Sequence, residues 1–288
     1  MALTDDLVAW YNCETAGASL EDVHGSNSLS PKYGTPYATT GKVNLGIGAL
    51  SGEYWRSGST PAGLQISGSF TMNFWFRWNA EGVSSPYLLY QSAGMYIRMA
   101  ASTKQLSWYT RDNVGGYDTL SSTQNLTSQN TWYMLTFQYN TINKQKEIYI
   151  NAIQRGSKIA PHGNTLATPI SYYYSWYMYS GWTGLFDERG VWSRFLGTDD
   201  RSALWNSGNG VTYDDLSGSE ATGAMTMSDG SVASIMERYK FKSATVAGPN
   251  AAVSSVMQRE GTPDLNPRYV IPQPATRRYF GFDKGRKR

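Results

Sequence analysis

The sequence predicts an all-β domain built as a sandwich or a barrel. Glycine, serine, threonine and aromatic residues are plentiful, whereas charged residues make up only 16% of the chain. β-Branched and aromatic side chains fit a pleated, half-buried surface, so this composition favours strands over helices. Short segments in which apolar and polar residues alternate are separated by glycine or polar turns. Strands of this length at this spacing are typical of sandwiches and barrels.

Two segments, residues 70–78 and 132–139, carry the clearest strand pattern. Because successive side chains of a strand point to opposite faces, every second residue shares a face. The shared apolar residues are Phe70, Met72, Phe74, Phe76 and Trp78 in the first segment and Tyr133, Leu135, Phe137 and Tyr139 in the second. Shorter segments of the same kind cover residues 87–91, 95–99 and 105–110, and residues 147–151 return as a hairpin partner of 132–139.

A single short helix is predicted after the last strand. Thr198 can cap its N-terminus, Asp199 and Asp200 suit its first turn, and Gly208 stands where a C-terminal glycine belongs. The predicted fold class therefore stays all-β.

The character of the chain changes near residue 217. Residues 1–217 carry 14 basic and 16 acidic side chains, whereas residues 218–288 carry 11 basic and 6 acidic ones. Apolar residues are sparse after 217 and prolines recur, so this segment cannot bury enough apolar surface to offset its ordering entropy. We therefore predict two parts, a β domain over 1–217 and an extended basic C-terminal arm over 218–288.

The basic residues of the arm are its candidate partner-binding residues. A basic arm on a nearly neutral body suits docking onto an acidic protein surface. Nucleic acid is the less favoured partner, because such binding needs interleaved aromatic residues and the basic residues near the end of the arm are accompanied only by Tyr279, Phe280 and Phe282. A solvated tail is the third alternative. The candidate residues are Arg277, Arg278, Lys284, Arg286, Lys287 and Arg288.

Neither export nor membrane insertion is expected from the sequence. The N-terminal segment has acidic residues where a signal peptide has basic ones, and no apolar stretch follows. No segment approaches the roughly 20 apolar residues of a membrane span. A single cysteine, Cys13, excludes an internal disulfide framework.

Four segments, in order, carry a further pattern: residues 7–11 with 22–27, residues 70–76, residues 132–137 with 147–151, and residues 184–192 with 195–208. Together they resemble the LamG-like jelly roll of the concanavalin A-like lectin/glucanase superfamily. The resemblance covers residues 1–217, and it implies a two-sheet antiparallel jelly-roll sandwich. The chain departs from the family pattern at two positions. Ala152 stands where the family's hairpin usually has glycine, so we expect a different turn there. Gly190 replaces a strand residue.

The resemblance also implies calcium as the metal of this domain. Asp22, Asn27 and Asp187 are at positions similar to the family's site, and calcium takes carboxylate, amide and carbonyl oxygens from irregular loops. The alternative is that Asp22 caps a turn and Asp187 makes an internal hydrogen bond or salt bridge.

No catalytic residue is predicted, although the superfamily includes glucanases. Glycoside hydrolysis needs two carboxylates on one face, and on a strand this requires i, i+2 spacing. No acidic residue of the chain has another acidic residue two positions on. The two histidines, His24 and His162, lie in turn-like segments without a nucleophile motif.

An aromatic run over residues 172–182 is a candidate ligand or interface surface. As a strand it would place aromatic side chains on both faces, which suits either a strand covered on both sides or a platform for protein or sugar. The candidate contact residues are Tyr173, Tyr177, Tyr179 and Trp182.

These observations lead to three functional hypotheses. The first is a non-enzymatic virion structural protein of a tailed phage, a capsid decoration, head-fibre or tail component located in the virion. Its arm would anchor the displayed jelly roll to other virion proteins in a homo- or hetero-oligomeric assembly. The second is a soluble carbohydrate-binding lectin, with or without calcium, whose partner is a cell-surface or environmental glycan. The third is a glycoside hydrolase.

Overall fold

The computed structural model describes residues 2–15, 20–34, 37–49, 54–56, 64–82, 84–91, 95–112, 115–159, 170–171, 175–177 and 182–217. All of these residues belong to one compact unit, Met1–Ser219. The arm, with its six predicted partner-binding residues, lies outside the described residues. Tyr173 and Tyr179 of the aromatic run lie outside them too.

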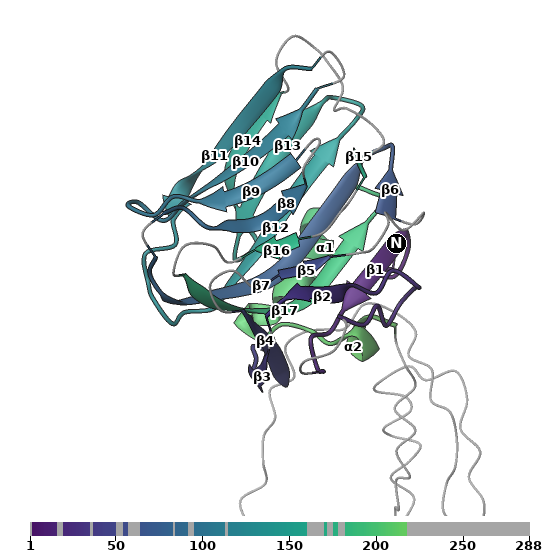
Figure 1. Cartoon of the computed structure of the whole chain (residues 1–288). Helices are drawn as coiled ribbons and strands as arrows, with labels where there is room; N and C mark the ends of the chain where they lie inside the picture. The colour runs from purple at the N-terminus through teal and green to yellow at the C-terminus, as the bar shows by residue number, and fades with distance from the viewer. Residues whose placement is uncertain are drawn as a thin grey trace, which may run out of the picture. The chain divides into compact units, whose positions relative to one another are not determined.

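Two antiparallel sheets, visible as two layers in Figure 1, confirm the predicted all-β sandwich. The larger sheet runs in the order β14-β13-β12-β7-β17-β4-β3, and β1 also pairs with β17. The first and last strands of the domain are therefore neighbours at its centre. The strands of this sheet are β1 (Leu7–Tyr11), β3 (Tyr37–Thr40), β4 (Leu45–Ala49), β7 (Phe70–Ala80), β12 (Tyr133–Asn140), β13 (Gln145–Ile150), β14 (Ile153–Ile159) and β17 (Thr183–Trp192).

The second sheet has five strands in the order β11-β10-β9-β8-β16. These are β8 (Tyr87–Gln91), β9 (Met95–Met99), β10 (Gln105–Arg111), β11 (Tyr117–Asn125) and β16 (Ser175–Tyr177). Two further pairs among the described residues join β2 (Ser30–Tyr33) to β5 (Tyr54–Arg56) and β6 (Gln65–Ile66) to β15 (Ile170–Ser171).

The predicted helix is present as α1 (Thr198–Trp205), with its ends set by other residues than expected. Gly197 is the N-cap, and its backbone N–H donates to the Asp200 carboxylate at 3.0 Å. The helix ends at Asn206, which has a φ of 45°, before a 3₁₀ turn that contains Gly208. Asn tolerates this left-handed conformation, so it serves the role predicted for glycine.

A second helix, α2 (Tyr213–Ser217), follows α1 and was not predicted. It starts with the carboxylate of Asp215 accepting a hydrogen bond from the backbone N–H of Thr212 at 2.9 Å. Within the described part of the chain, no helix is long and apolar enough to cross a membrane.

The core lies between the two sheets and follows the predicted alternation. The apolar faces predicted for residues 70–78 and 132–139 are buried there together with inward residues of the second sheet, such as Ile97 and Trp108. Fully burying a side chain of this size stabilises the fold by roughly 1.5–3 kcal/mol. The opposite face of β7 packs a smaller cluster, in which Trp75 stacks on Trp205 at 5.2 Å between ring centroids.

The β13–β14 turn differs from the expectation drawn from Ala152. Ile150 pairs with Ile153, so only Asn151 and Ala152 form the turn, and both have positive φ, 54° and 62°. This is the two-residue hairpin geometry that normally favours Asn-Gly. Ala152 therefore occupies the glycine conformation instead of changing the turn, because the register of the two strands leaves no other length.

Gly190 is explained by two neighbouring tryptophans. A Cβ added at this position would lie 2.2 Å from the ring of Trp192 and 2.8 Å from that of Trp10. The two rings meet edge to face at 6.0 Å between centroids. The departure at Gly190 thus makes room for this aromatic pair between β1 and β17.

A buried ion cluster connects the two sheets. The Lys146 ammonium, fully buried on β13, donates to the Asp118 carboxylate of β11 at 3.2 Å and to the Thr110 hydroxyl at 2.9 Å. Lys158 of β14 also pairs with Asp118. Burial lowers the pKa of Lys146 to about 8, although the neighbouring Asp118 acts in the opposite direction.

Candidate functional site

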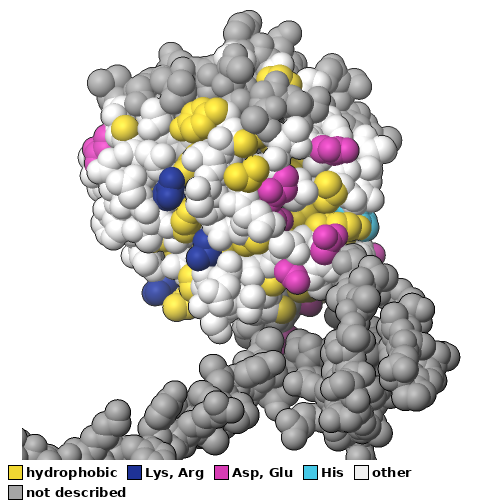
Figure 2. All heavy atoms as spheres, turned by 90° about the horizontal axis from the view of Figure 1, so that it is seen from below, with side chains coloured by type: hydrophobic (Ala, Val, Ile, Leu, Met, Phe, Trp, Pro, Cys, Tyr) yellow, Lys and Arg dark blue, Asp and Glu magenta, His cyan; other side chains and the backbone are white. Residues whose placement is uncertain are grey.

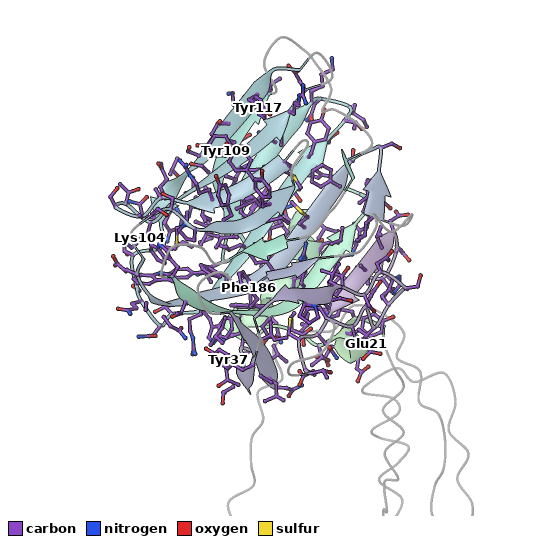
Figure 3. The ribbon with its side chains drawn as sticks, in the orientation of Figure 1. Glu21, Tyr37, Lys104, Tyr109, Tyr117 and Phe186 are labelled. Carbon is purple, nitrogen blue, oxygen red and sulfur yellow. The ribbon has the colours of Figure 1, made fainter. Side chains whose placement is uncertain are left out.

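The outer face of the five-stranded sheet carries a group of tyrosines. In β9, Met95, Ile97 and Met99 are buried, whereas Tyr96 and Arg98 between them are only partly buried. The same alternation in β10 turns Trp108 inward and Tyr109 outward. Because the inward residues are large and apolar, the core fixes which face of each strand the tyrosines occupy. We call the group Tyr87, Tyr90, Tyr96, Tyr109 and Tyr117 the tyrosine face; Figure 3 labels Tyr109 and Tyr117 on neighbouring strands.

The rings of the tyrosine face contact one another across the strands. Tyr96 pairs in register with Tyr109, and the two rings stack at 4.2 Å with an interplanar angle of 19°. Tyr87 meets Tyr96 edge to face at 5.4 Å and Tyr90 at 5.2 Å. Burial raises the pKa of Tyr96, with smaller contributions from Tyr109 and Tyr87. The contacts hold the inner rings in place and leave the outer ones open, since Tyr117 is 68% exposed and Tyr90 39%.

Two arginines add positive charge to this face. The Arg98 guanidinium lies 5.6 Å from the ring centroid of Tyr109 and donates to its hydroxyl at 3.4 Å. Its Nε is buried and makes no hydrogen bond within the described part of the chain. Arg111 lies over the ring of the exposed Tyr117 at 6.0 Å.

Within the four strands that carry the tyrosine face, no carboxylate lies on the outer face beside these arginines; Asp112, in the turn that follows Arg111, accepts a hydrogen bond from the backbone N–H of Gly116 at 2.6 Å. The only acidic residue of β8 to β11 is Asp118, and it points inward to the ion cluster. Tyrosine rings offer flat apolar surface with a polar tip, and arginine binds carboxylate or sulfate groups through paired hydrogen bonds. The face is therefore chemically suited to a flat, hydroxyl-rich molecule that carries negative charge.

The predicted aromatic run borders the tyrosine face in part. Tyr177 lies in β16, where its backbone pairs with Tyr87 of β8 at the edge of the sheet. Trp182, in contrast, is fully buried: its ring packs on Trp78, and its Nε1 donates to the backbone oxygen of Ser84 at 2.6 Å. The Trp182 side chain is therefore part of the core, and its contact with a ligand stays a prediction.

Asp22 is surrounded by N–H donors. Its Oδ1 accepts hydrogen bonds from the backbone N–H groups of Trp10, His24 and Gly25 at 2.9 to 3.2 Å. Its Oδ2 accepts from both the backbone and the side chain of Asn27, at 3.0 and 2.9 Å. This is the geometry of a capped turn, and it uses the oxygens that a calcium ion would need.

Asp187 lies in the closing strand and is bonded in the same way. Its carboxylate accepts from the backbone N–H groups of Lys42 and Val43 at 2.7 and 2.8 Å and from that of Glu188 at 2.9 Å. Burial raises its pKa to about 7 despite these three bonds. No group of three acidic, histidine or cysteine residues able to hold a metal occurs within the described ranges. The carboxylate oxygens of Asp22 and Asp187 already accept N–H groups, so these residues do not fit a calcium ligand set as they are arranged. Calcium binding stays a prediction.

Sequence reasoning did not identify the tyrosine face. The alternation of residues 95–99 and 105–110 was recognised, yet the patterns Met-Tyr-Ile-Arg-Met and Trp-Tyr-Thr-Arg contain large apolar or aromatic residues in both registers. Their available signal was the repeated Tyr-x-Arg motif, Tyr96 to Arg98 and Tyr109 to Arg111, which puts one tyrosine and one arginine on the same face of each strand.

A family model for the concanavalin A-like lectin/glucanases superfamily matches residues 33–200. The chain belongs to this superfamily. A comparison with curated proteins gave no match. The superfamily membership confirms the resemblance found in the sequence and the jelly-roll class of the sandwich.

Solved structures with a similar fold include toxin binding domains. The binding domain of Paraclostridial mosquitocidal protein 1 is 18% identical, with a TM-score of 0.58 over 71% of this chain and 53% of that one. The binding domain of botulinum neurotoxin DC in complex with SialylT is 13% identical, with a TM-score of 0.57 over 72% and 52% of the two chains. The chain thus spans about half the length of these proteins, and the likeness shows a shared fold.

Proposed function

We propose that this chain is a non-enzymatic binding module whose tyrosine face holds a saccharide, with acidic sugars preferred. The observation that carries the proposal is the combination of five clustered tyrosines with Arg98 and Arg111 on strands that turn no carboxylate outward. Pyranose rings offer C–H groups to an aromatic plane and hydroxyl groups to polar tips, and both kinds of contact are available here.

The fold relatives support a role in recognition. One solved structure contains the botulinum neurotoxin DC binding domain with SialylT, and another contains it with rat synaptotagmin II. Those ligands belong to those proteins. They support the proposal to the extent that chains with this sandwich include binding domains for glycan and protein ligands.

Glycan arrays containing sialylated, uronic-acid and sulfated saccharides test the proposal, and calorimetry with the best ligand then tests the face. We expect Tyr90→Ala to weaken binding roughly three- to tenfold, since an aromatic contact contributes about 0.5–1.5 kcal/mol. Tyr37→Ala is the matched control, because Tyr37 is 37% exposed against 39% for Tyr90 and lies in β3 of the other sheet.

The arginines are tested by selectivity rather than by affinity alone. Arg98→Gln and Arg111→Gln should reduce binding of acidic saccharides while leaving their neutral counterparts within twofold. If neither array nor calorimetry detects binding, or if Tyr90→Ala and Tyr37→Ala bind equally well, the saccharide proposal is wrong.

A second candidate function is a structural component of a tailed-phage virion, with residues 218–288 as its anchor. The specific observation is the charge contrast between 11 basic and 6 acidic residues in this arm and 14 basic and 16 acidic residues in 1–217. Binding of the full chain to assembled particles should fall at least tenfold when the six basic residues from Arg277 to Arg288 are replaced by Gln. Unchanged binding would contradict an anchoring role of the arm.

A further inference from the structure

An acidic cavity lies at the end of the sandwich where β1, the β3–β4 turn, β17 and α2 meet. Its volume is about 310 Å³, within the range of pockets that bind small molecules. In Figure 2, which views the molecule from below, most acidic side chains gather on one side of the visible face and the basic ones on the other. The described residues that line the cavity are Asn12, Glu14, Val23, Asn44, Glu188, Thr212, Tyr213 and Asp214, so it holds three carboxylates and no lysine or arginine.

Glu188 is the side chain that points to a ligand. It is 1% exposed, and its Oε2 accepts a hydrogen bond from Trp10 Nε1 at 2.6 Å. Its Oε1 is buried and has no hydrogen-bond partner among the described residues. A buried polar atom without a partner is costly, by roughly 1–3 kcal/mol, so an oxygen left open toward a cavity suggests that something else binds it.

The backbone of β17 explains how Glu188 reaches the cavity. The pairing of β17 with β7 is interrupted between Asp187 and Gly190, and Glu188 has a φ of 39° in this irregular segment. A left-handed conformation at a non-glycine residue is strained, and such strain gathers at functional sites. The bulge separates the two adjacent carboxylates: Asp187 bonds to backbone N–H groups, while Glu188 lines the cavity.

Glu14 provides a second open oxygen from a different part of the chain. Its Oε2 accepts a hydrogen bond from the backbone N–H of Leu45 at 3.3 Å, whereas its Oε1 is buried without a partner in the part of the chain that is described. Two carboxylate oxygens from separate segments thus lack donors beside one cavity. Burial raises the pKa of Glu188 to about 9, and the charges of Asp187 and Glu14 act in the same direction. The natural partner is therefore a group that donates several N–H bonds and carries positive charge, because such a group would hold Glu188 in its charged form.

We propose that this cavity binds an organic cation, a protonated amine or guanidinium group carried on a larger molecule. Glu14 and Glu188 accept its hydrogen bonds, and the lining ring of Tyr213 offers a surface for a cation–π contact. The volume is about ten times the roughly 30 Å³ that one water occupies, so a bare metal ion would leave most of it empty. The absence of a metal-holding group of three ligands within the described residues also favours an organic cation.

Calorimetry with the full chain tests this proposal and distinguishes two sources of the same chemistry. N-acetyl-arginine amide and N-acetyl-lysine amide represent a protein side chain, and glucosamine represents an amino sugar. We expect saturable binding of at least one of these, with N-acetyl-glutamine amide and N-acetylglucosamine as neutral controls that bind at least tenfold more weakly. The source is the class with the higher affinity.

Single substitutions then assign the site. Glu188→Gln and Glu14→Gln should each weaken cation binding at least tenfold, and thermal unfolding shows whether each variant folds. Glu21→Gln is the matched control, because Glu21 is exposed and does not line the cavity. Tyr90→Ala should leave cation binding unchanged, so this site can fail or succeed independently of the tyrosine face.

Three results would overturn the proposal. They are the absence of saturable binding for every cationic probe, equal binding of cationic and neutral probes, and unchanged binding in folded Glu188→Gln and Glu14→Gln chains. Calcium titration is the further arm: binding of Ca²⁺ that depends on Glu188, with no binding of the organic cations, would assign the cavity to a metal instead.

Discussion

At the scale of single residues, the turn formed by Asn151 and Ala152 shows that strand pairing can impose a backbone conformation that a residue does not favour. The register between β13 and β14 requires a two-residue turn, and Ala152 adopts a φ of 62° to complete it. A non-glycine residue in the left-handed region costs roughly 1–2 kcal/mol, and only glycine is free of that cost. The surrounding hairpin therefore holds Ala152 in an unfavourable conformation.

Replacing Ala152 by glycine should stabilise the domain. We expect Ala152→Gly to raise the free energy of unfolding by about 0.5–1 kcal/mol, because relief of the strain exceeds the lost methyl packing and the added chain entropy. Urea unfolding followed by tryptophan fluorescence measures the change. Ala80→Gly in β7 is the control, and it should destabilise, since Ala80 is not among the residues with positive φ. A loss of stability in Ala152→Gly would contradict the strain argument.

At the scale of elements, the ion cluster of Lys146, Asp118 and Lys158 links strands β13 and β14 of the larger sheet to β11 of the second sheet. Lys146 is fully buried and has Asp118 as its anionic partner, whereas Asp118 pairs with both lysines. Burial raises the pKa of Asp118, but the hydrogen bonds and charges of Lys158 and Lys146 outweigh it, so that the pKa lies below its usual value of 3.8. The carboxylate is thus held in its charged form.

This arrangement predicts a pH dependence of stability. A lowered folded-state pKa means that Asp118 contributes stability above pH 3.8, and this contribution is lost as the pH falls through the folded-state value. Urea unfolding between pH 2 and 6 should show this loss as a fall in the free energy of unfolding toward low pH. In Asp118→Asn this fall should be smaller. At pH 6 we expect Asp118→Asn to cost about 3–5 kcal/mol, because it leaves a buried ammonium without an anion.

Lys146→Met is the matched comparison for this pair. It removes the buried cation and keeps the apolar stem, while Asp118 retains its ion pair with Lys158. We therefore expect a smaller loss than in Asp118→Asn, since replacing a buried charge by an apolar group of similar size is often tolerated. A larger loss in Lys146→Met would mean that the Lys158 pair does not support Asp118.

For the molecule as a whole, the two proposed sites have opposite charge and lie on different parts of the sandwich. The tyrosine face, on β8 to β11, carries arginines, whereas the acidic cavity is formed near β1, the β3–β4 turn and α2 at the lower end in Figure 1. The tyrosine face would attract anionic groups and the acidic cavity cationic groups. A ligand that carries both charges would therefore bind each of them at a different part of the domain. The sandwich between them supplies the rigid backbone on which both sets of side chains are placed.

The sequence by itself determined the all-β class, the inward faces of residues 70–78 and 132–139, and the superfamily. The period of two decides which residues of a strand share a face. The face that carries the large apolar side chains, such as phenylalanine and tryptophan, is the one that points to the core. These features depend on local order along the chain, which is why they could be predicted.

Only the tertiary structure decided the two candidate sites. The tyrosine face depends on the pairing of β8, β9, β10 and β11. Trp182 is buried in the core, where its ring packs on Trp78 and its Nε1 donates to the backbone oxygen of Ser84. The cavity depends on a bulge that turns Glu188 toward residues far away in the sequence, such as Glu14 and Tyr213. Long-range pairing and local backbone irregularity leave no periodic signal in one sequence, so the fold had to be seen before either site could be proposed.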